Sequence, residues 1–195
     1  MKIIVFGATG LIGREIINQL SPEHEIIRVS RSSGDIQADY TDESSLIKMF
    51  EEIGSFDALV SVAGNDSQFV AFKDLKSTHF RSGIERKLMG QVNLVLLGMK
   101  YINKGGSFTL SSGYLSHYPN AYSMATSPFN AFIDNFVQSM SSQMPKHIRI
   151  NVVSPAPVAD KAQYGVVTPK MVAGDFVQII EGQETGKVFK VWNMD

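Results

Sequence analysis

Residues 1–13 read Met-Lys-Ile-Ile-Val-Phe-Gly-Ala-Thr-Gly-Leu-Ile-Gly, and the rest of the chain can be interpreted outward from them. Residues 2–6 are a nearly unbroken apolar run, which is typical of a strand buried on both faces of a parallel sheet. Ile12, Ile16, Ile17 and Leu20 then recur at helical spacing until Pro22, which cannot continue a helix. A second apolar run at 25–30 follows. The pattern predicts a strand, a helix and a parallel strand joined by a right-handed crossover.

The alternation of strands and helices continues to the end of the chain. We expect further strands at 36–39, 58–63, 107–111, 149–153 and 187–192. We expect helices from Thr41 or Asp42 to Gly54, from 80 to a stop at Gly105-Gly106, from an N-cap at Ser127 to 140, and over 169–181. Strands alternating with helices predict an α/β doubly wound, three-layer sandwich around a mostly parallel sheet of about seven strands. No linker, repeat or low-complexity tract interrupts the pattern, so we expect residues 1–195 to form a single domain.

The composition narrows the class of function. Apolar residues make up 44% of the chain, charged residues 19%, and the formal net charge is −1. Because no run of five like charges occurs, we expect neither a nucleic acid nor an anionic membrane as partner. There is no cysteine, and the four histidines lack metal-ligand spacing, so we expect no metal site. No stretch approaches the roughly 18 apolar residues of a membrane span. The chain enters a strand at residue 2, which leaves no room for a signal peptide and predicts a cytoplasmic protein.

Glycines at 7, 10 and 13 stand between the first predicted strand and helix, and this context gives their spacing meaning. Gly7 permits a tight turn, Gly10 allows the backbone to approach a pyrophosphate, and Gly13 lets helix and strand pack closely. The helix N-terminus adds free N–H groups and a favourable dipole for phosphate. The alternative is a tight turn that holds no ligand. We predict a dinucleotide site whose first contacts are Gly7, Ala8, Thr9, Gly10, Leu11, Ile12 and Gly13.

The end of the second strand bears on the choice of cofactor. A site specific for NAD places an acid there, against the adenosine ribose. This chain has Ser30, Arg31, Ser32 and Ser33, and no acid before Asp35. A guanidinium pairs with phosphate oxygens in a bidentate manner, so the segment favours NADPH, with its 2′-phosphate, over NADH. The alternative for Arg31 is a solvated surface arginine.

Further motifs are similar, in order and over nearly the whole length, to the short-chain dehydrogenase/reductase family. Asp39 stands where the family has an acid that contacts adenine, and residues 61–64, Ser-Val-Ala-Gly, keep the second half of the family's Asn-Asn-Ala-Gly. Residues 149–155 resemble the strand that leads to the nicotinamide pocket, although Ala156 replaces the usual glycine. The resemblance implies a Rossmann fold, cofactor contacts at Asp39, Ala63, Gly64 and Pro155, and a catalytic serine at Ser112.

The family's Asn-Ser-Tyr-Lys tetrad is altered in this sequence. Lys87 occupies the asparagine position of an Asn-Leu-x-Gly pattern. The Tyr-x-x-x-Lys motif can be placed in two registers. One puts Tyr122 at the tyrosine position and Thr126 at the lysine position. The other puts Thr126 at the tyrosine position and Asn130 at the lysine position, and we prefer it because it preserves the helix length with one deletion near Pro145. In neither register is there a lysine; the first one after Tyr122 is Lys146, which lies outside the residues that the structure describes.

The resemblance therefore implies a lysine and an asparagine in exchanged positions. We expect Lys87 to restore a cation near Ser112, where an ammonium could stabilise negative charge on a substrate oxygen. Asn130 would hydrogen-bond this cation or a water molecule. The alternative is that Lys87 points into solvent. The loop after the fifth strand offers four candidates that could take the role of the missing tyrosine: Tyr114, His117, Tyr118 and Tyr122.

Three functions compete. The first is an NADP(H)-dependent oxidoreductase acting on a small carbonyl or alcohol substrate. The second is a dinucleotide sensor or regulatory protein that has lost the chemistry. The third is an epimerase of the extended family, which is disfavoured because only about 40 residues follow Pro155. The segment 158–168 is short and mixed in polarity, which suggests an open, shallow substrate site. Apolar positions on the helices at 80–99 and 129–140 exceed the needs of one sheet face, so we expect a homodimer or homotetramer; the alternative is that all of them serve the core.

Overall fold

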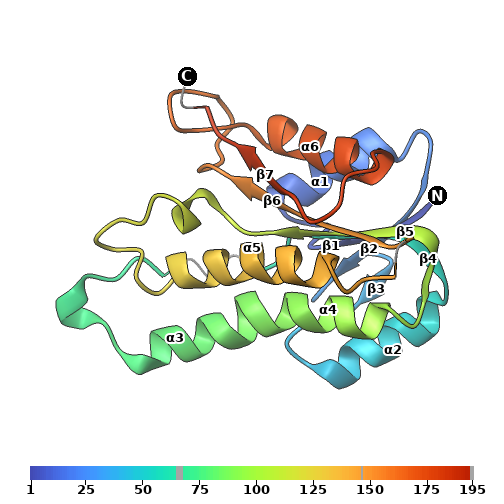
Figure 1. The fold of residues 1–195 in the computed structure, drawn as a ribbon, viewed down its shortest axis with the longest axis horizontal. Coiled ribbons are helices and arrows are strands. Elements are labelled where there is room, and N and C mark those ends of the chain that lie inside the picture. Colours follow the sequence, from blue (N-terminus) through green and yellow to red (C-terminus); the bar gives the residue numbers. More distant parts are fainter. Residues whose placement is uncertain (65–67, 146, 194–195) are drawn as a thin grey trace.

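A computed structural model describes residues 1–64, 68–145 and 147–193. Its seven strands form one sheet in the order β3-β2-β1-β4-β5-β6-β7, and each neighbouring pair is parallel (Figure 1). The strands are β1 (Lys2–Phe6), β2 (Glu25–Ser30), β3 (Ile36–Gln37), β4 (Phe56–Ser61), β5 (Ile102–Ser111), β6 (Arg149–Pro155) and β7 (Val188–Val191). The predicted doubly wound α/β fold is confirmed, and the sheet is parallel throughout.

Helices cover both faces of this sheet. They are α1 (Leu11–Leu20), α2 (Glu43–Ile53), α3 (Ser77–Gly83), α4 (Gly90–Gly98), α5 (Ser127–Ser141) and α6 (Pro169–Glu181), with shorter turns η1 (Phe72–Asp74), η2 (Ile84–Met89) and η3 (Tyr114–Ser116). Figure 1 shows α1 and α6 together on one face and α2, α4 and α5 on the other. In the described part of the chain, no helix has both the length and the apolar character needed to cross a membrane.

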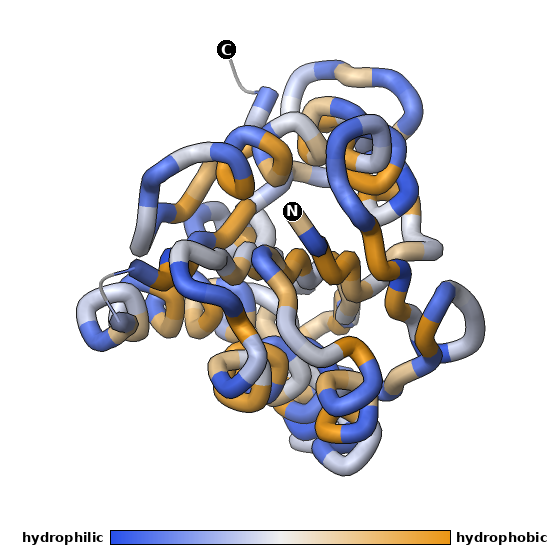
Figure 2. Tube along the Cα trace, turned by 90° about the vertical axis from the view of Figure 1, so that its right-hand side faces the viewer, coloured by the Kyte–Doolittle hydropathy of each residue, from blue (hydrophilic) through white to orange (hydrophobic). Residues whose placement is uncertain are grey.

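Each face of the sheet carries its own apolar core. Fully buried side chains such as Phe50, Phe56 and Phe108 fill the layer beneath α2, α4 and α5, while Phe176 and Ile16 fill the layer beneath α1 and α6. Hydrophobic segments gather along the central strands and the inner sides of the helices, and hydrophilic ones lie toward the periphery (Figure 2). The continuous apolar runs of the central strands are thus explained, because both faces of these strands are covered.

The long helix expected from 80 to 99 is composite. It begins earlier, at the start of α3, and contains a π-helical segment, η2, before it continues as α4. It ends at Gly98, so the expected stop at Gly105-Gly106 was wrong. These two glycines belong to β5, which begins at Ile102, and Gly105 has a φ of +87° there. They lie where the pairing of β4 and β5 shifts register, an irregularity that small residues accommodate.

Two cap predictions can be checked. Asp42 is the N-cap of α2, where its carboxylate accepts a hydrogen bond from the backbone N–H of Ser44 at 2.9 Å. Ser127 was expected to cap α5, but the cap is Thr126 and Ser127 is the first helical residue. The Ser127 hydroxyl instead bonds the Ser123 hydroxyl at 2.7 Å, inside the preceding turn. The helix therefore begins one residue earlier than Pro128 alone suggested.

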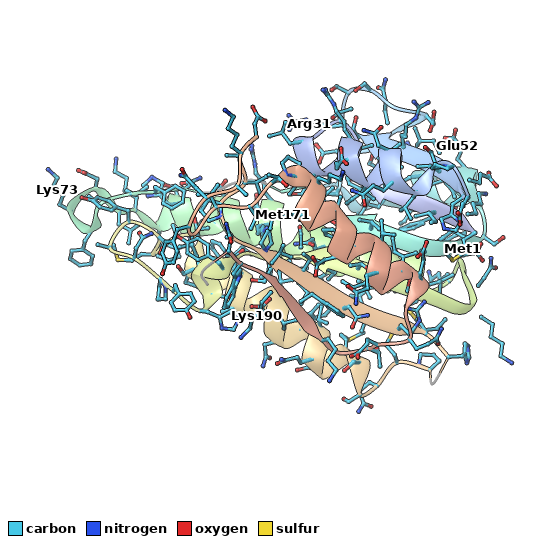
Figure 3. All side chains as sticks on the ribbon, turned by 90° about the horizontal axis from the view of Figure 1, so that it is seen from above. Met1, Arg31, Glu52, Lys73, Met171 and Lys190 are labelled. Carbon is cyan, nitrogen blue, oxygen red and sulfur yellow. The ribbon has the colours of Figure 1, made fainter. Side chains whose placement is uncertain are left out.

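The carboxyl ends of the strands lie on one side of the molecule. The segment that carries Lys73 and leads into α3 projects beyond the body on this side, as does the loop between β5 and α5 (Figures 1 and 3). Ligands of open α/β sheets bind outside the carboxyl ends of the strands. The two cavities described next are found there.

Candidate functional site

The turn between β1 and α1 shows which of its glycines the fold itself requires. Gly7 has a φ of +92°, and a Cβ on it would lie 2.8 Å from the backbone nitrogen of Ala63. A Cβ on Gly13 would collide with the Gly7 carbonyl oxygen. A Cβ on Gly10 would meet only that same oxygen, at 3.4 Å. Packing therefore requires glycine at 7 and 13, whereas Gly10 leaves open space at the N-terminus of α1, where a pyrophosphate would lie.

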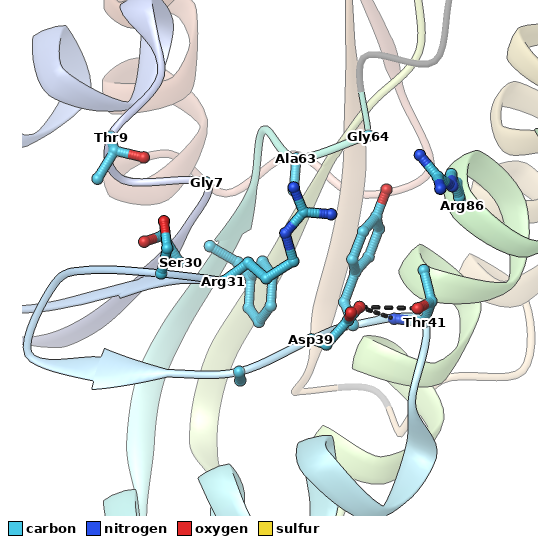
Figure 4. Close-up of a pocket in the computed structure, with 13 residues that line it drawn as sticks. Gly7, Thr9, Ser30, Arg31, Asp39, Thr41, Ala63, Gly64 and Arg86 are labelled. Carbon is cyan, nitrogen blue, oxygen red and sulfur yellow. Dashed lines mark hydrogen bonds between the residues drawn. The ribbon is translucent and has the colours of Figure 1, made fainter.

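A cavity of about 380 Å³ opens beside this turn. Arg31 enters it from the end of β2, and Arg86 enters it from η2 on the far side (Figure 4). Its other described lining residues are Phe6, Gly7, Thr9, Ser30, Ser32, Ala38, Asp39, Tyr40, Thr41, Ala63 and Gly64. The cavity thus joins the glycine turn to two arginines, which gives it a surplus of donors for anionic oxygens.

Asp39 is the acid of this cavity, and its charge is fixed locally. Its carboxylate accepts hydrogen bonds from the hydroxyl and the backbone N–H of Thr41, at 2.7 and 3.0 Å. These bonds lower the pKa of Asp39, and the nearby charges of Arg31 and Arg86 lower it further. The carboxylate remains ionised at neutral pH and lies near Arg31 and Arg86, where the exocyclic amine of adenine would find an acceptor.

Asp35, the first acid after β2, forms an ion pair outside this cavity. Asp35 forms a forked ion pair with Arg28 on the exposed side of the strand, with Nε to carboxylate distances of 3.0 and 3.2 Å. The pair lowers the pKa of Asp35. Ser30 is also engaged, because its hydroxyl bonds the backbone of Ser33 within the turn. Arg31 lines the cavity together with Ser30 and Ser32, and among these three it is the one cation.

Sequence reasoning missed Arg86. In a regular α-helix over 80–99, Arg86 would lie opposite the apolar positions and face solvent. The π-helical turn of η2 changes the direction of its side chain, so that Arg86 lines the first cavity while its neighbour Lys87 lines the second. π-helical turns of this kind are often found at functional sites. No apolar spacing in the sequence indicates where one begins.

A second cavity of about 680 Å³ adjoins the first, and the two share Ala63 and Gly64. It brings together Leu11 and Ile12 of the glycine turn, Pro155 at the end of β6, and Lys87, Ser112, Thr126 and Asn130. The remaining walls are largely apolar and include Phe69, Leu115, Phe129 and Val158. The site is more apolar than segment 158–168 alone suggested, because three of these four side chains come from other segments.

Lys87 contacts the end of β5. Its ammonium donates a hydrogen bond to the carbonyl oxygen of Ser112, with an Nζ–O distance of 3.3 Å. Burial lowers the pKa of Lys87 to about 8, and the carboxylate of Asp134 opposes this shift. The side chain therefore points inward rather than into solvent. It holds a cation that can lose its proton close to neutral pH.

Ser112 is buried, and its hydroxyl has no hydrogen-bond partner among the described residues. The strand end that carries it is held by Gln91, which the sequence analysis did not single out. The Gln91 amide donates to the carbonyl of Ser111 and accepts from its N–H, both at 2.9 Å. A fixed hydroxyl with an unused donor can bind an oxygen atom of a ligand.

The residues that the two registers assign to the altered motif lie in different surroundings. Thr126 is buried, lines the second cavity, and donates its hydroxyl to the carbonyl of Gln68 at 3.3 Å. Tyr122 is 57% exposed and does not line the cavity. Asn130 is buried, and its amide lies against Gly113. Of the four substitutes for the missing tyrosine, Tyr114 alone is among the described residues that line this cavity.

In the described part of the chain, no cluster of three or more His, Asp or Glu side chains could hold a metal ion. The polar side chains among the described lining of the second cavity are the ammonium of Lys87, the amide of Asn130 and the hydroxyls of Ser111, Ser112, Tyr114 and Thr126. Such a set can bind phosphates and polarise a carbonyl oxygen.

Comparison with known proteins identifies the family. A family model described as enoyl-(acyl carrier protein) reductase matches residues 14–190. The chain therefore belongs to the short-chain dehydrogenase/reductase family. A comparison with curated proteins gave no match.

Solved structures agree with this assignment. The protein lin1944 from Listeria innocua is 34% identical, with a TM-score of 0.93, and the match covers 98% of this chain and 100% of that one. A small-chain dehydrogenase in complex with NADPH is 27% identical, with a TM-score of 0.90 and coverage of 99% and 97%. A short-chain dehydrogenase/reductase from Serratia marcescens is 17% identical, with a TM-score of 0.86 and coverage of 98% and 96%, which shows the shared fold alone.

Proposed function

We propose that the protein is an NADPH-dependent oxidoreductase that acts on a small carbonyl or alcohol substrate. The observation that carries the proposal is the continuity of the two cavities through Ala63 and Gly64. The first suits the adenosine half of a dinucleotide and the second suits its nicotinamide half together with a substrate. The glycine turn lies where the pyrophosphate joins the halves.

The preference for NADPH is supported by Arg31 and Arg86, which line the same cavity from opposite sides. Two guanidinium groups can neutralise the 2′-phosphate that distinguishes NADPH from NADH. A related small-chain dehydrogenase of known structure was crystallised in complex with NADPH. Asp35, the first acid after β2, is paired with Arg28 and does not line this cavity.

A binding titration tests this preference. The emission of the reduced cofactor is followed for NADPH and NADH, since Trp192 is the only tryptophan in the chain and lies outside the lining of either cavity. We expect NADPH to bind about tenfold more tightly or better, as one charge-assisted contact allows. The Arg31→Ala variant should lose most of this difference and keep its NADH affinity. Arg81→Ala, an exposed arginine on α3, is the matched control. Equal affinities in the unmutated protein would refute the assignment.

Within the second cavity, each polar group can be given a role. When bound, the nicotinamide ring supplies a hydride to the carbonyl carbon. The free hydroxyl of Ser112 is placed to donate a hydrogen bond to the carbonyl oxygen. The ammonium of Lys87 stabilises the negative charge that develops there, an electrostatic role that needs no tyrosine. Tyr114 or Lys87 then supplies the proton.

A carbonyl-dependent oxidation screen tests the activity. Purified protein is mixed with NADPH and a panel of small aldehydes and ketones, and loss of cofactor absorbance is recorded. Lys87→Met should lower turnover about 100-fold or more on any substrate found, the range for loss of a transition-state charge contact. Undiminished turnover in this variant would remove Lys87 from the mechanism.

The second candidate is a regulatory dinucleotide-binding protein. It is favoured by one observation: in the preferred register the tyrosine and lysine positions hold Thr126 and Asn130, and the Thr126 hydroxyl is already bonded to Gln68. Tight, stoichiometric NADPH binding without oxidation by any carbonyl of the panel would support this reading over the first.

We further propose that the protein assembles as a homodimer or homotetramer. Large apolar side chains are exposed along α3 to α5, among them Leu96 at 52% and Phe132 at 45%. Phe132 stacks on Phe136 with ring centroids 6.2 Å apart, so the exposed aromatic surface is continuous. Phe136 also packs against the core, but Leu96 and Phe132 belong to neither core cluster, and a second copy would cover them.

A further inference from the structure

Asp134 is a buried acid that the proposed chemistry does not use. It lies on α5 one helical turn after Asn130, and the residue is 7% exposed. Neither carboxylate oxygen has a hydrogen-bond partner among the described residues. A buried carboxylate in this condition is costly unless charged groups compensate it. Its surroundings should therefore hold its electrostatic partners.

Two such groups face Asp134. Asn130, one helical turn before Asp134, lines the second cavity together with Lys87, and α5 packs against η2, so the carboxylate lies close enough to favour the charged ammonium of Lys87. On the other side, Nε2 of His117 lies 3.8 Å from Oδ2 of Asp134. The carboxylate therefore stands between a lysine that lines the cavity and a histidine in the loop after β5.

His117 connects this arrangement to the surface. Its side chain is 35% exposed, and its ring meets the indole of Trp192 edge-on, with centroids 5.2 Å apart. Tyr118 packs on the same indole at 5.4 Å, and the ammonium of Lys190 lies 4.9 Å from its centre. The charged or titratable groups around His117 are thus Asp134, Tyr118 and, across the indole, Lys190.

We infer that Asp134 is the counter-charge of Lys87 across the wall of the second cavity, and that His117 is the second partner of the same carboxylate. The inference rests on the proposed function in one respect, because an ammonium beside Ser112 has a catalytic role only if an oxygen atom of a ligand binds there. The charge network that the inference describes can be tested without measuring turnover. It comprises three side chains from η2, α5 and the loop after β5.

The network keeps the ammonium of Lys87 charged in a buried position, where burial disfavours the charged form. The described residues that line the second cavity with Lys87 include the hydroxyl of Ser112 and the amide of Asn130, and none of them is an acid. Burial alone would favour the neutral amine. Removal of the Asp134 charge should therefore release the proton of Lys87 at lower pH and leave the amine less firmly oriented.

Nuclear magnetic resonance of the lysine ε-carbons provides a test that requires neither cofactor nor substrate. The protein is labelled with ¹³C-lysine, and the Lys87 signal is assigned by its absence in Lys87→Met. In Asp134→Asn, which keeps the shape of the side chain, we expect the midpoint of the Lys87 titration to fall by about one pH unit, a tenfold change in proton affinity. Glu85→Gln removes an exposed carboxylate from the same helical segment and serves as the matched control. An unchanged midpoint in Asp134→Asn would overturn the inference.

The second arm of the network is tested by a double-mutant cycle. His117→Gln, Asp134→Asn and the double variant are unfolded in urea, and we expect the effects of the two changes to be non-additive, because Nε2 of His117 lies 3.8 Å from Oδ2 of Asp134. Strict additivity would show that His117 is not a partner of Asp134. A protein that shows the fall of the Lys87 midpoint and this coupling but oxidises no NADPH would retain the network and lose the proposed activity, so the two failures are distinguishable.

Discussion

Replacing Lys87 by methionine should raise the free energy of unfolding at neutral pH, even though it removes a hydrogen bond. Burial lowers the pKa of Lys87 from 10.5 to about 8, so the folded state disfavours its charged form. The unfolded chain imposes no such penalty. Methionine has a similar length and no charge, and it can occupy the same space without the cost of desolvation.

The magnitude follows from this shift. A lowering from 10.5 to about 8 corresponds to about 3 kcal/mol at any pH where both states are protonated. Lys87 as a whole is only partly buried, so we reduce this to about 2 kcal/mol to allow for solvent screening. Loss of the bond to the Ser112 carbonyl removes about 1 kcal/mol. The net gain expected for Lys87→Met at pH 7 is about 1 kcal/mol.

The pH dependence of this stability difference is a more specific test than its size at pH 7. The unfolded state binds more protons than the folded state between pH 8 and 10.5, so the stability of the unmutated protein rises with pH in that window. The penalty is fully present below pH 8 and fades above it. The advantage of Lys87→Met should therefore shrink by about 1 kcal/mol between pH 7 and about pH 9.5.

Urea unfolding followed by circular dichroism measures this difference at both pH values. Lys48→Met, at an exposed position on α2, is the control and should give the same small difference at each pH. If the difference between Lys87→Met and the unmutated protein is independent of pH, Lys87 is not desolvated and the reasoning fails.

Three further outcomes are expected. Gly10→Ala should fold normally but bind NADPH at least tenfold more weakly, whereas Gly13→Ala should lose several degrees of melting temperature, because its Cβ meets backbone; equal effects in the two variants would contradict the packing. Asn130→Lys should destabilise the protein by about 1 kcal/mol or more by placing a second cation in the cavity, and adding Lys87→Asn should recover most of this; strict additivity in urea unfolding would show that the two positions do not interact. Light scattering should give a multiple of 21.5 kDa for the unmutated protein and a smaller mass for Phe132→Glu; a monomer at micromolar concentration before mutation would end the assembly proposal.

Most of the fold could be predicted because its signals are local. Apolar runs bounded by glycine marked the strands, and helical spacing with Pro and Gly marked the helices, to the residue in the case of 169–181. The errors fell at positions whose local structure is decided by contacts with distant parts of the chain. The glycines at 105 and 106 read as a helix stop, but the neighbouring strand β4 extends β5 back through them. Pairing with a distant strand leaves no trace in the local pattern.

Some residues of the candidate site could be predicted from the sequence and others could not. The residues of the glycine turn and Arg31 lie in one stretch of βαβ sequence, and their positions follow from the order of the elements. Arg86 and Asp134 were not predicted, because each lies on a helix whose apolar periodicity leaves it on a polar face. A polar position in a sequence carries the same pattern whether it faces water or a cavity. The direction of the Arg86 side chain depends on the π-helical turn at η2, which no composition signal marks.

The exchange of lysine and asparagine that we propose has a physical explanation only when Asp134 is included. With Asn130 on α5, a cation near Ser112 must come from the neighbouring helix, and the π-helical turn that carries Lys87 places one at the Ser112 carbonyl. The position one helical turn after Asn130 on α5 then holds Asp134, a carboxylate that would be unpaired beside a neutral site. A lysine without this acid would lose its proton more readily, and an acid without the lysine would have only His117 to compensate it. The charge balance of the cavity is therefore a property of all three elements together, and a residue-by-residue comparison with a tetrad motif cannot reveal it.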